Sequence, residues 1–178
     1  PFAKPPSPPK PPSPPKPEPV SHWMREAERI AASMRTELGT PESEHQDPGS
    51  TYILTGSPMW NVATKAERRA VIEAFGTNAK LRTVCMSDSL IDDDLARSWA
   101  SVLACPTCVI ESLSLESNPI SGAGIEAIAS ALSSNSSLRE LKLRNLHGRV
   151  HNQAEEALAE ALEHQHHLTK LYADFKSY

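Results

Sequence analysis

The sequence predicts an α/β solenoid in which short parallel strands line the inside and helices cover the outside. In residues 110–135, three aliphatic side chains alternate as in a strand, and after a turn four apolar side chains return at helical spacing. The strand residues are Ile110, Leu113 and Leu115, and the helix residues are Ile125, Ile128, Ala129 and Leu132. A single unit of this kind leaves one apolar face of each element in water, so it needs stacked copies of itself.

Copies of the unit recur along the chain at a nearly constant period. The strand pattern begins at Leu81, Ile110, Leu138 and Leu168, which are 29, 28 and 30 residues apart. This period, with three aliphatic residues per strand and a full helix per repeat, is the signature of leucine-rich repeats. A first, less regular unit is predicted from a strand at residues 52–54 and a helix over residues 63–75.

The first 20 residues are predicted to form a proline-rich extended arm. Residues 1–19 hold 11 of the 16 prolines, and proline cannot donate to a backbone ladder, so we expect polyproline II geometry. Two registers of the arm fit the pattern recognised by aromatic grooves of the SH3 type, namely Pro5, Pro8 and Lys10, and Pro11, Pro14 and Lys16. The alternative is a spacer or docking strap.

A cap helix is predicted over residues 21–39. Ser21 is a preferred N-cap residue and Gly39 a preferred stop, and the apolar stripe between them consists of Trp23, Ala27, Ile30, Met34 and Leu38. The terminal repeat of a stack needs a cover, so we assign this role to the helix, with partner binding as the alternative. Residues 40–50 are a polar linker, and residues 51–178 are the repeat domain.

Residues between the aliphatic positions of each strand are predicted to point outward from the concave face of the sheet. This face is the usual binding surface of stacked repeats, and a merely solvated face is the alternative. It is small and neutral at one end and mostly cationic at the other. Its predicted members are Thr83, Cys85, Ser87, Ser112, Ser114, Glu116, Glu140, Lys142, Arg144, Lys170 and Tyr172.

The last strand, over residues 168–173, is predicted to expose its outer edge because the sequence after it encodes no helix. An unpaired edge with apolar side chains nearby is a pairing site for another chain. We therefore expect a partner protein to dock at Leu171, Phe175 and Tyr178.

Composition excludes several functional classes. The net charge is −4 and the pI is near 6.0, so the chain has no excess of positive charge that would favour nucleic-acid binding. No apolar run is long enough to span a membrane. Three cysteines without a secretory signal favour an intracellular protein, cytoplasmic or cytoskeletal. The chain begins with Pro1, so an organelle reached through a removed targeting segment is the alternative.

No motif predicts catalysis, a cofactor or a metal site. Cys105 and Cys108 form a C-x-x-C pair, but it follows a helix and precedes a strand, the reverse of the order in thiol-redox proteins. The histidines are predicted to form a polar loop, since no second ligand pair lies nearby; they are His164, His166 and His167. The acidic run at residues 92–94 is predicted to cap the next helix.

Two segments carry a resemblance to a known family. They are residues 115–125, LESNPISGAGI, and residues 131–141, ALSSNSSLREL, and they are followed by a long turn at residues 145–152 and the helix sequence EEALAEAL. Over residues 50–175 the chain resembles the leucine-rich-repeat domain of tropomodulins and leiomodins, and similar repeats occur in ribonuclease-inhibitor-type proteins.

The resemblance implies binding to the pointed end of actin filaments, without catalysis. The chain differs from the family pattern in two places. The proline-rich arm and one helix stand where the family has a long N-terminal region, and the family's C-terminal helix is not encoded before Tyr178.

Three functional hypotheses follow. The first is a non-catalytic protein–protein interaction module that serves as a structural scaffold subunit of a larger assembly, with other protein subunits as its partners. The alternative is binding of actin filaments at their pointed end, in the manner of tropomodulins. The third hypothesis is a thiol-redox protein acting through Cys105 and Cys108.

Overall fold

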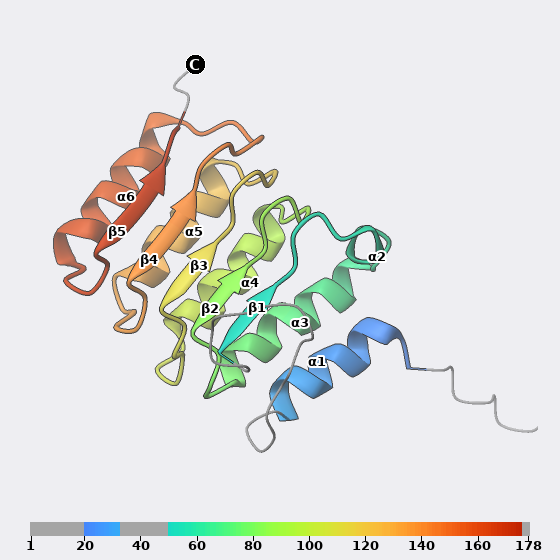
Figure 1. The fold of residues 1–178 in the computed structure, drawn as a ribbon. Helices are drawn as coiled ribbons and strands as arrows, with labels where there is room; N and C mark the ends of the chain where they lie inside the picture. Colours follow the sequence, from blue (N-terminus) through green and yellow to red (C-terminus); the bar gives the residue numbers. More distant parts are fainter. Residues whose placement is uncertain (1–19, 33–49, 176–178) are drawn as a thin grey trace, which may run out of the picture.

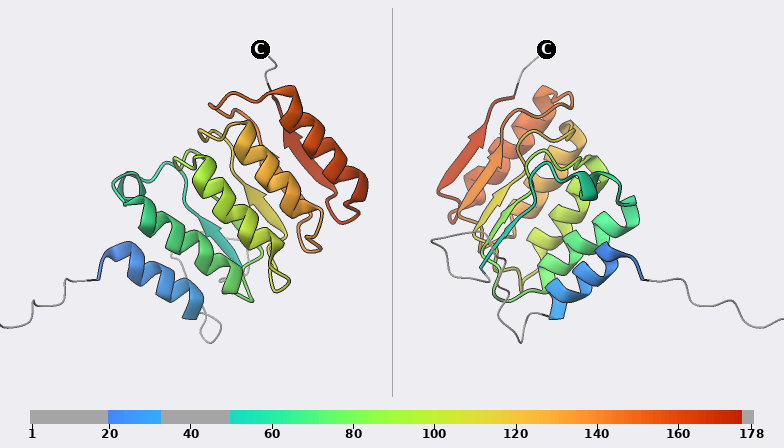
Figure 2. Two further views of the ribbon diagram at one scale, coloured as in Figure 1. Left: turned by 180° about the vertical axis from the view of Figure 1, so that it is seen from behind. Right: turned by 45° about the vertical axis from the view of Figure 1, so that its right-hand side comes forward.

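The repeats stack side by side into one parallel sheet with helices on one of its faces (Figures 1 and 2). The structure is a computed structural model and describes residues 20–32 and 50–175. The strands lie in the order β1-β2-β3-β4-β5, which confirms the predicted α/β solenoid. The elements are α1 (His22–Ala32), β1 (Thr51–Ile53), α2 (Pro58–Asn61), α3 (Lys65–Thr77), β2 (Thr83–Cys85), α4 (Asp93–Ala104), β3 (Ser112–Ser114), α5 (Gly122–Leu132), β4 (Glu140–Leu143), α6 (Asn152–His164) and β5 (Lys170–Ala173).

Strand pairing places corresponding residues of every repeat in one row. Val84 pairs with Tyr52 on one side and Leu113 on the other, and the row continues through Leu141 to Leu171. Within this row Val84, Leu113 and Leu141 are buried, and Tyr52 and Leu171 at its ends are partly buried. The apolar residues that flank the row are buried, namely Leu81, Met86, Ile110, Leu115, Leu138 and Leu143. A shift of one residue would turn the row toward water, so the phase of the aliphatic residues fixes the register.

The helices pack in the same order as the strands, with α1 on α3, α3 on α4, α4 on α5 and α5 on α6. In α5, Ile125 and Leu132 are fully buried. Gly124 lets α5 approach α4, because a Cβ atom there would lie 2.6 Å from Ile120 Cγ2 and 2.7 Å from Asp93 Oδ1. The small residues that open this helix therefore serve close packing.

Each of the first four strands is followed by a residue in the left-handed backbone region. These residues are Gly56, Asp88, Ser117 and Asn145, with φ angles of 57°, 50°, 57° and 55°. Glycine, aspartate and asparagine enter this region more readily than other residues. The repeated turn sends the chain from the sheet to the helical layer at the same place in each of these four repeats.

The buried side chain of Asn118 joins the turn of its own repeat to the turn before it. Its Oδ1 accepts the backbone N–H groups of Ser89 at 2.9 Å and Ile91 at 3.0 Å. Its Nδ2 donates to the carbonyls of Met86 at 2.8 Å and Leu115 at 2.9 Å. One amide thus satisfies backbone groups that would otherwise be buried without a partner.

Three further buried amides join the end of one helix to the start of a later strand. Asn78, Asn135 and Gln165 each stand three residues before the first aliphatic residue of a strand. Their side-chain nitrogens donate at 2.8, 2.7 and 3.0 Å to the carbonyls of Ile30, Leu103 and Leu132, respectively. These carbonyls lie in the last turns of α1, α4 and α5, where the helix supplies no N–H donor of its own.

Helix α1 packs on α3 as the cap of the stack. Ser21 Oγ accepts a backbone N–H of the first turn at 3.2 Å, so the helix begins at the predicted N-cap. Trp23 packs edge-on against Trp60 with ring centroids 5.0 Å apart, and its Nε1 donates to the carbonyl of Met59 at 3.2 Å. Trp23, Ala27 and Ile30 are buried as predicted, whereas Met34, Leu38 and Gly39 lie outside the described residues.

The first repeat departs from its predicted bounds. The strand is Thr51–Ile53, and the helix expected over residues 63–75 is α3, which the short helix α2 precedes. Thr64 and Glu67 form a capping box that fixes the start of α3. Local capping chemistry, more than the apolar pattern, decides this boundary.

The acidic run at residues 92–94 caps α4 through its first member. Asp92 Oδ1 accepts the N–H of Leu95 at 3.0 Å. Asp93 reaches the next repeat, where its carboxylate accepts from the backbone N–H and hydroxyl of Ser121 at 2.7 and 2.6 Å. Asp94 pairs with Lys65 from the preceding repeat. The run therefore joins three repeats as well as capping one helix.

We predict that Asn118→Ala lowers the free energy of unfolding by about 3 kcal/mol, because it leaves several buried backbone groups without partners. Urea denaturation followed by circular dichroism measures the change. Asn61→Ala, at an exposed asparagine, serves as the control and is expected to change stability by less than about 0.5 kcal/mol. Equal stability of the two variants would contradict the role assigned to Asn118.

Candidate functional site

The face of the sheet opposite the helices, here called the open face, carries the residues predicted to bind a partner (right-hand view of Figure 2). Two rows cross it in register. One row contains Thr83, Ser112, Glu140 and Lys170, and the other contains Cys85, Ser114, Lys142 and Tyr172. Ser87, Glu116 and Arg144 follow the ends of β2, β3 and β4. The parallel register therefore brings all the predicted members together on one surface.

The N-terminal half of the open face is a chain of hydroxyl and thiol contacts. Cys85 Sγ lies 3.6 Å from Thr55 Oγ1 and 3.5 Å from Ser87 Oγ, which in turn lies 3.0 Å from Ser114 Oγ. The Ser114 hydroxyl also donates to Glu116 at 3.3 Å. Ser114 is only 7% exposed, so little of its surface is accessible to a partner, and its role in partner binding stays a prediction. Its hydroxyl contacts Ser87 of the preceding repeat and Glu116 of its own repeat.

The C-terminal half holds ion pairs around an exposed tyrosine. Arg144 Nε lies 2.8 Å from Glu116 Oε1, and Lys142 Nζ lies 3.1 Å from Glu140 Oε1. The charged ends of Lys142 and Arg144 lie 5.6 and 5.3 Å from the ring centroid of Tyr172, within the range of cation–π attraction. The hydrogen bond to Glu140 raises the pKa of Lys142, so this lysine stays charged.

The thiol of Cys85 is half-buried in the N-terminal half of the open face. Burial acts to raise the pKa of this thiol, but hydrogen bonds with Ser87 and Thr55 stabilise the thiolate and outweigh it. The net pKa of Cys85 is therefore lowered, which makes this thiol more nucleophilic at neutral pH.

The edge of the last strand, where a partner was predicted to dock, has its apolar residues partly covered. Within the described residues, β5 pairs with β4 alone. Leu171 and Phe175 are half-buried against the core, whereas Tyr172 is 36% exposed. Tyr178 lies outside the described residues.

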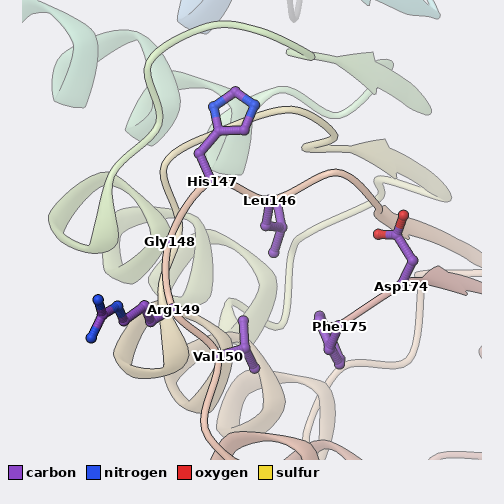
Figure 3. A pocket seen from close by; sticks show the side chains of 7 residues that line it. All are labelled: Leu146, His147, Gly148, Arg149, Val150, Asp174 and Phe175. Carbon is purple, nitrogen blue, oxygen red and sulfur yellow. The ribbon is translucent and has the colours of Figure 1, made fainter. Parts of the chain in front are cut away.

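A hollow of about 670 Å³ lies beside this edge, between the turn before α6 and the segment after β5 (Figure 3). Of its lining residues, only Phe175 had been singled out from the sequence, as part of the C-terminal docking edge. The signal for it was the length of the turn at residues 145–152, which is too long for a simple strand-to-helix connection. Its lining consists of Leu146, His147, Gly148, Arg149, Val150, Asp174 and Phe175.

The cysteine pair occupies a helix end. Cys105 follows the C-terminus of α4, where the helix dipole disfavours a thiolate, although hydrogen bonds from Thr107 lower its pKa. Cys108 is buried, and both cysteines are free thiols. Thr107 stands three residues before Ile110, the position that carries a buried amide in other repeats. The thiol-redox hypothesis thus gains no support from this position.

In residues 20–32 and 50–175, no group of three or more histidine, cysteine or acidic side chains is placed to hold a metal ion. Among the helices that the structure describes, none combines the length and apolar character needed to cross a membrane. The predicted arm contacts fall outside the described residues; they are Pro5, Pro8, Lys10, Pro11, Pro14 and Lys16.

A comparison with protein-family models identifies the repeats. The model of the tropomodulin and leiomodin (TMOD/LMOD) leucine-rich domain matches residues 60–178. The chain belongs to this family. The match includes β2 to β5, the cluster around Tyr172 and the hollow, and it begins after α1 and β1. The resemblance drawn from the two sequence segments is confirmed.

Two solved structures of this family are similar to the chain. One is described as leiomodin-1 actin-binding site 2; it is 26% identical with a TM-score of 0.70, over 88% of this chain and 81% of that chain. The other is the tropomodulin C-terminal domain of Caenorhabditis elegans, which is 19% identical with a TM-score of 0.69, over 88% of this chain and 85% of that chain, and shows the shared fold alone. A comparison with curated proteins finds no match.

We predict that Ser87→Ala raises the pKa of the Cys85 thiol, because it removes the strongest hydrogen bond to the thiolate. Alkylation of Cys85 at neutral pH should then slow, and its pH profile should shift to higher pH. Peptide mapping by mass spectrometry separates Cys85 from Cys105 and Cys108. Thr107→Ala is the control, because its hydroxyl contacts Cys105; an unchanged profile in Ser87→Ala would contradict the prediction.

Proposed function

We propose that this chain is a non-catalytic actin-binding domain. The observation that carries the proposal is the likeness to leiomodin-1 actin-binding site 2, which extends over 88% of this chain at 26% identity. The family match over residues 60–178 supports it. A cytoskeletal location in the cell is part of the same proposal.

We place the actin contact on the C-terminal half of the open face. Tyr172 is exposed and is flanked by the charged ends of Lys142 and Arg144. Tyrosine and arginine are the residue types that most often dominate the binding energy of an interface. The two cations also hold the tyrosine ring in place, which reduces the side-chain entropy lost on binding.

The scaffold hypothesis ranks below actin binding. Its three docking surfaces were the arm, the open face and the C-terminal edge, and the last two serve an actin-binding domain equally well. The leiomodin likeness names actin as the partner of a similar domain. No feature of the described residues favours another assembly, so we propose actin as the partner to test first.

Pointed-end exchange in barbed-end-capped actin filaments provides the test. We expect the full chain at micromolar concentration to slow this exchange, and a double variant with Tyr172→Ala and Arg144→Glu to require at least about tenfold more protein, because each change removes about 1 kcal/mol or more of contact energy. Glu156→Ala, at an exposed position on α6, is the matched control.

Two outcomes distinguish the proposed function from the proposed location of the actin contact. If the unmodified chain neither slows exchange nor binds monomeric actin, the proposed function fails. If it acts on actin and the double variant acts equally well while keeping the same melting temperature, the function stands and the contact lies elsewhere on the domain.

A further inference from the structure

We infer that the groove between α5 and α6, on the helical face of the domain, binds a basic amphipathic helix of another protein. This inference goes beyond actin binding and does not rest on it. Three observations carry it: a hollow with a floor of small side chains, a carboxylate on each wall that forms no ion pair among the described residues, and the absence of lysine and arginine from both helices.

The groove lies on the outer surface where α5 and α6 run side by side (left-hand view of Figure 2). Its volume is about 430 Å³, and its floor consists of Ala129, Ala157 and Ala161, whose side chains end at Cβ. On α5 the lining extends from Glu126 to Ser133, which is about 10 Å, or two helical turns. A hollow of this length accommodates the side chains of two successive turns of a partner helix.

Each wall of the groove carries a carboxylate. Glu126 comes from α5 and Glu160 from α6. Among the described residues, neither forms an ion pair, whereas Glu116 on the open face pairs with Arg144. Charges at the rim of an interface determine which partner is accepted more than they determine affinity. The two glutamates therefore select a partner with cations on both sides of its contact surface.

The lysines and arginines of the last repeats lie outside these two helices. Residues 98–138 and 150–169 contain no lysine or arginine, and they include all of α5 and α6. The glutamates on the two helices are Glu126, Glu155, Glu156, Glu160 and Glu163. The cations of these repeats lie on strands or in connecting turns; they are Arg139, Lys142, Arg144, Arg149 and Lys170. The helical face thus presents negative charge to a partner.

The C-terminal ends of both helices add to this negative potential. α5 ends at Leu132 and α6 at His164, and the groove reaches both ends. The C-terminus of an α-helix carries a partial negative charge, which favours a cation nearby. The ring of His164 faces its own helix, since its Nδ1 lies 3.1 Å from the carbonyl oxygen of Glu160. The groove is therefore apolar along its floor and negative along its walls and at its end.

A basic amphipathic helix matches these properties. In such a helix, apolar residues at every third or fourth position form a stripe, and lysines or arginines border the stripe on both sides. The stripe would lie on the alanine floor, because helices pack by placing ridges of side chains into grooves. The bordering cations would then reach Glu126 on one wall and Glu160 on the other.

Two other occupants fit the groove less well. In a second copy of the chain, Lys142 and Arg144 are already paired with glutamates of their own copy, so binding would have to break these ion pairs. In the chain's own first 19 residues, lysines recur every six positions between 11 prolines. Proline disfavours a helix, and lysines six residues apart in an extended chain lie about 19 Å from one another, which is longer than the groove.

The test uses the full chain and three fluorescent peptides of about 18 residues, or five helical turns. The first consists of leucine, alanine and lysine, with the leucines on one face and lysines on both sides of them. The second has glutamate in place of lysine. The third has the composition of the first in an order that spreads the leucines around the helix. We expect only the first peptide to bind and to shift the amide NMR signals of Ser130 and Ala157.

Two variants change the groove itself. Glu126→Lys combined with Glu160→Lys, here called the wall variant, reverses the charge of both walls. Ser130→Phe fills the groove from an exposed position. Each should weaken binding of the first peptide at least about tenfold, because the wall variant replaces attraction by repulsion and the phenylalanine excludes the apolar stripe.

Matched controls lie outside the groove. Glu28→Lys combined with Glu73→Lys makes the same change in net charge at exposed positions on α1 and α3. Ala159→Phe places the same ring at an exposed position on α6 that does not line the groove. Both controls should bind the first peptide like the unmodified chain.

Several results would overturn the inference. They are equal binding of the first peptide and either of the others, no binding by the first peptide, amide shifts confined to the open face, and equal binding by the wall variant and its control. If the wall variant does not fold by circular dichroism, the two phenylalanine variants decide. The assay contains no actin, so its outcome is separate from that of the actin test.

Two further results would overturn the inference in favour of another occupant. A dimer in sedimentation that the wall variant dissociates would assign the groove to a second copy. A shift of the Ser130 and Ala157 signals in the absence of peptide, when Lys4, Lys10 and Lys16 are replaced by serine, would assign it to the chain's own first residues.

Discussion

Hydrogen bonds that pass from one repeat to the next are the interaction on which this solenoid depends. A helix leaves the carbonyls of its last turn without partners, and a strand leaves one edge unpaired. Here the next repeat supplies both: buried amides reach the helix ends, and each new strand pairs with the one before it. Burial of the apolar rows requires these hydrogen bonds between repeats. Without them, backbone N–H and C=O groups would be buried together with the apolar side chains and would have no partners. Apolar packing and the hydrogen bonding of backbone groups therefore both favour the same arrangement of stacked repeats.

The sequence predicted those parts of the structure that repeat. Three aliphatic residues per strand determine which face is buried, and their period determines the number of strands, so the strand order and register could be anticipated. Buried amides at Asn78, Asn135 and Gln165 also recur, and their shared position before a strand was a signal that the apolar pattern does not contain. The burial of Ser114 depends on Ser87 of the preceding repeat as well as on Glu116 of its own repeat. Such contacts across strands do not follow from one repeat alone.

The chemistry of the open face changes along the stack. Its N-terminal half offers hydroxyl and thiol groups that bond to one another, so few polar groups remain for a partner. Its C-terminal half offers charged groups, an exposed aromatic ring and, beside them, the edge of β5, which pairs with β4 alone in the described part of the chain. The domain thus concentrates its interaction chemistry in the last two repeats. The first repeats and helix α1, which packs on them, support the fold that positions these groups.

Nearest-neighbour packing gives this arrangement a dynamic consequence. Because each repeat contacts only those beside it, cooperativity between distant repeats is weak, and local unfolding begins where a repeat has one neighbour. The last strand is such a place: its aliphatic residues Leu168 and Leu171 are half-buried, whereas their counterparts Leu138 and Leu141 are fully buried. We expect its amides to exchange faster than those of the inner strands. A protein that docked on these repeats would then also protect the part of the domain that opens first, and recognition and local stability would be coupled.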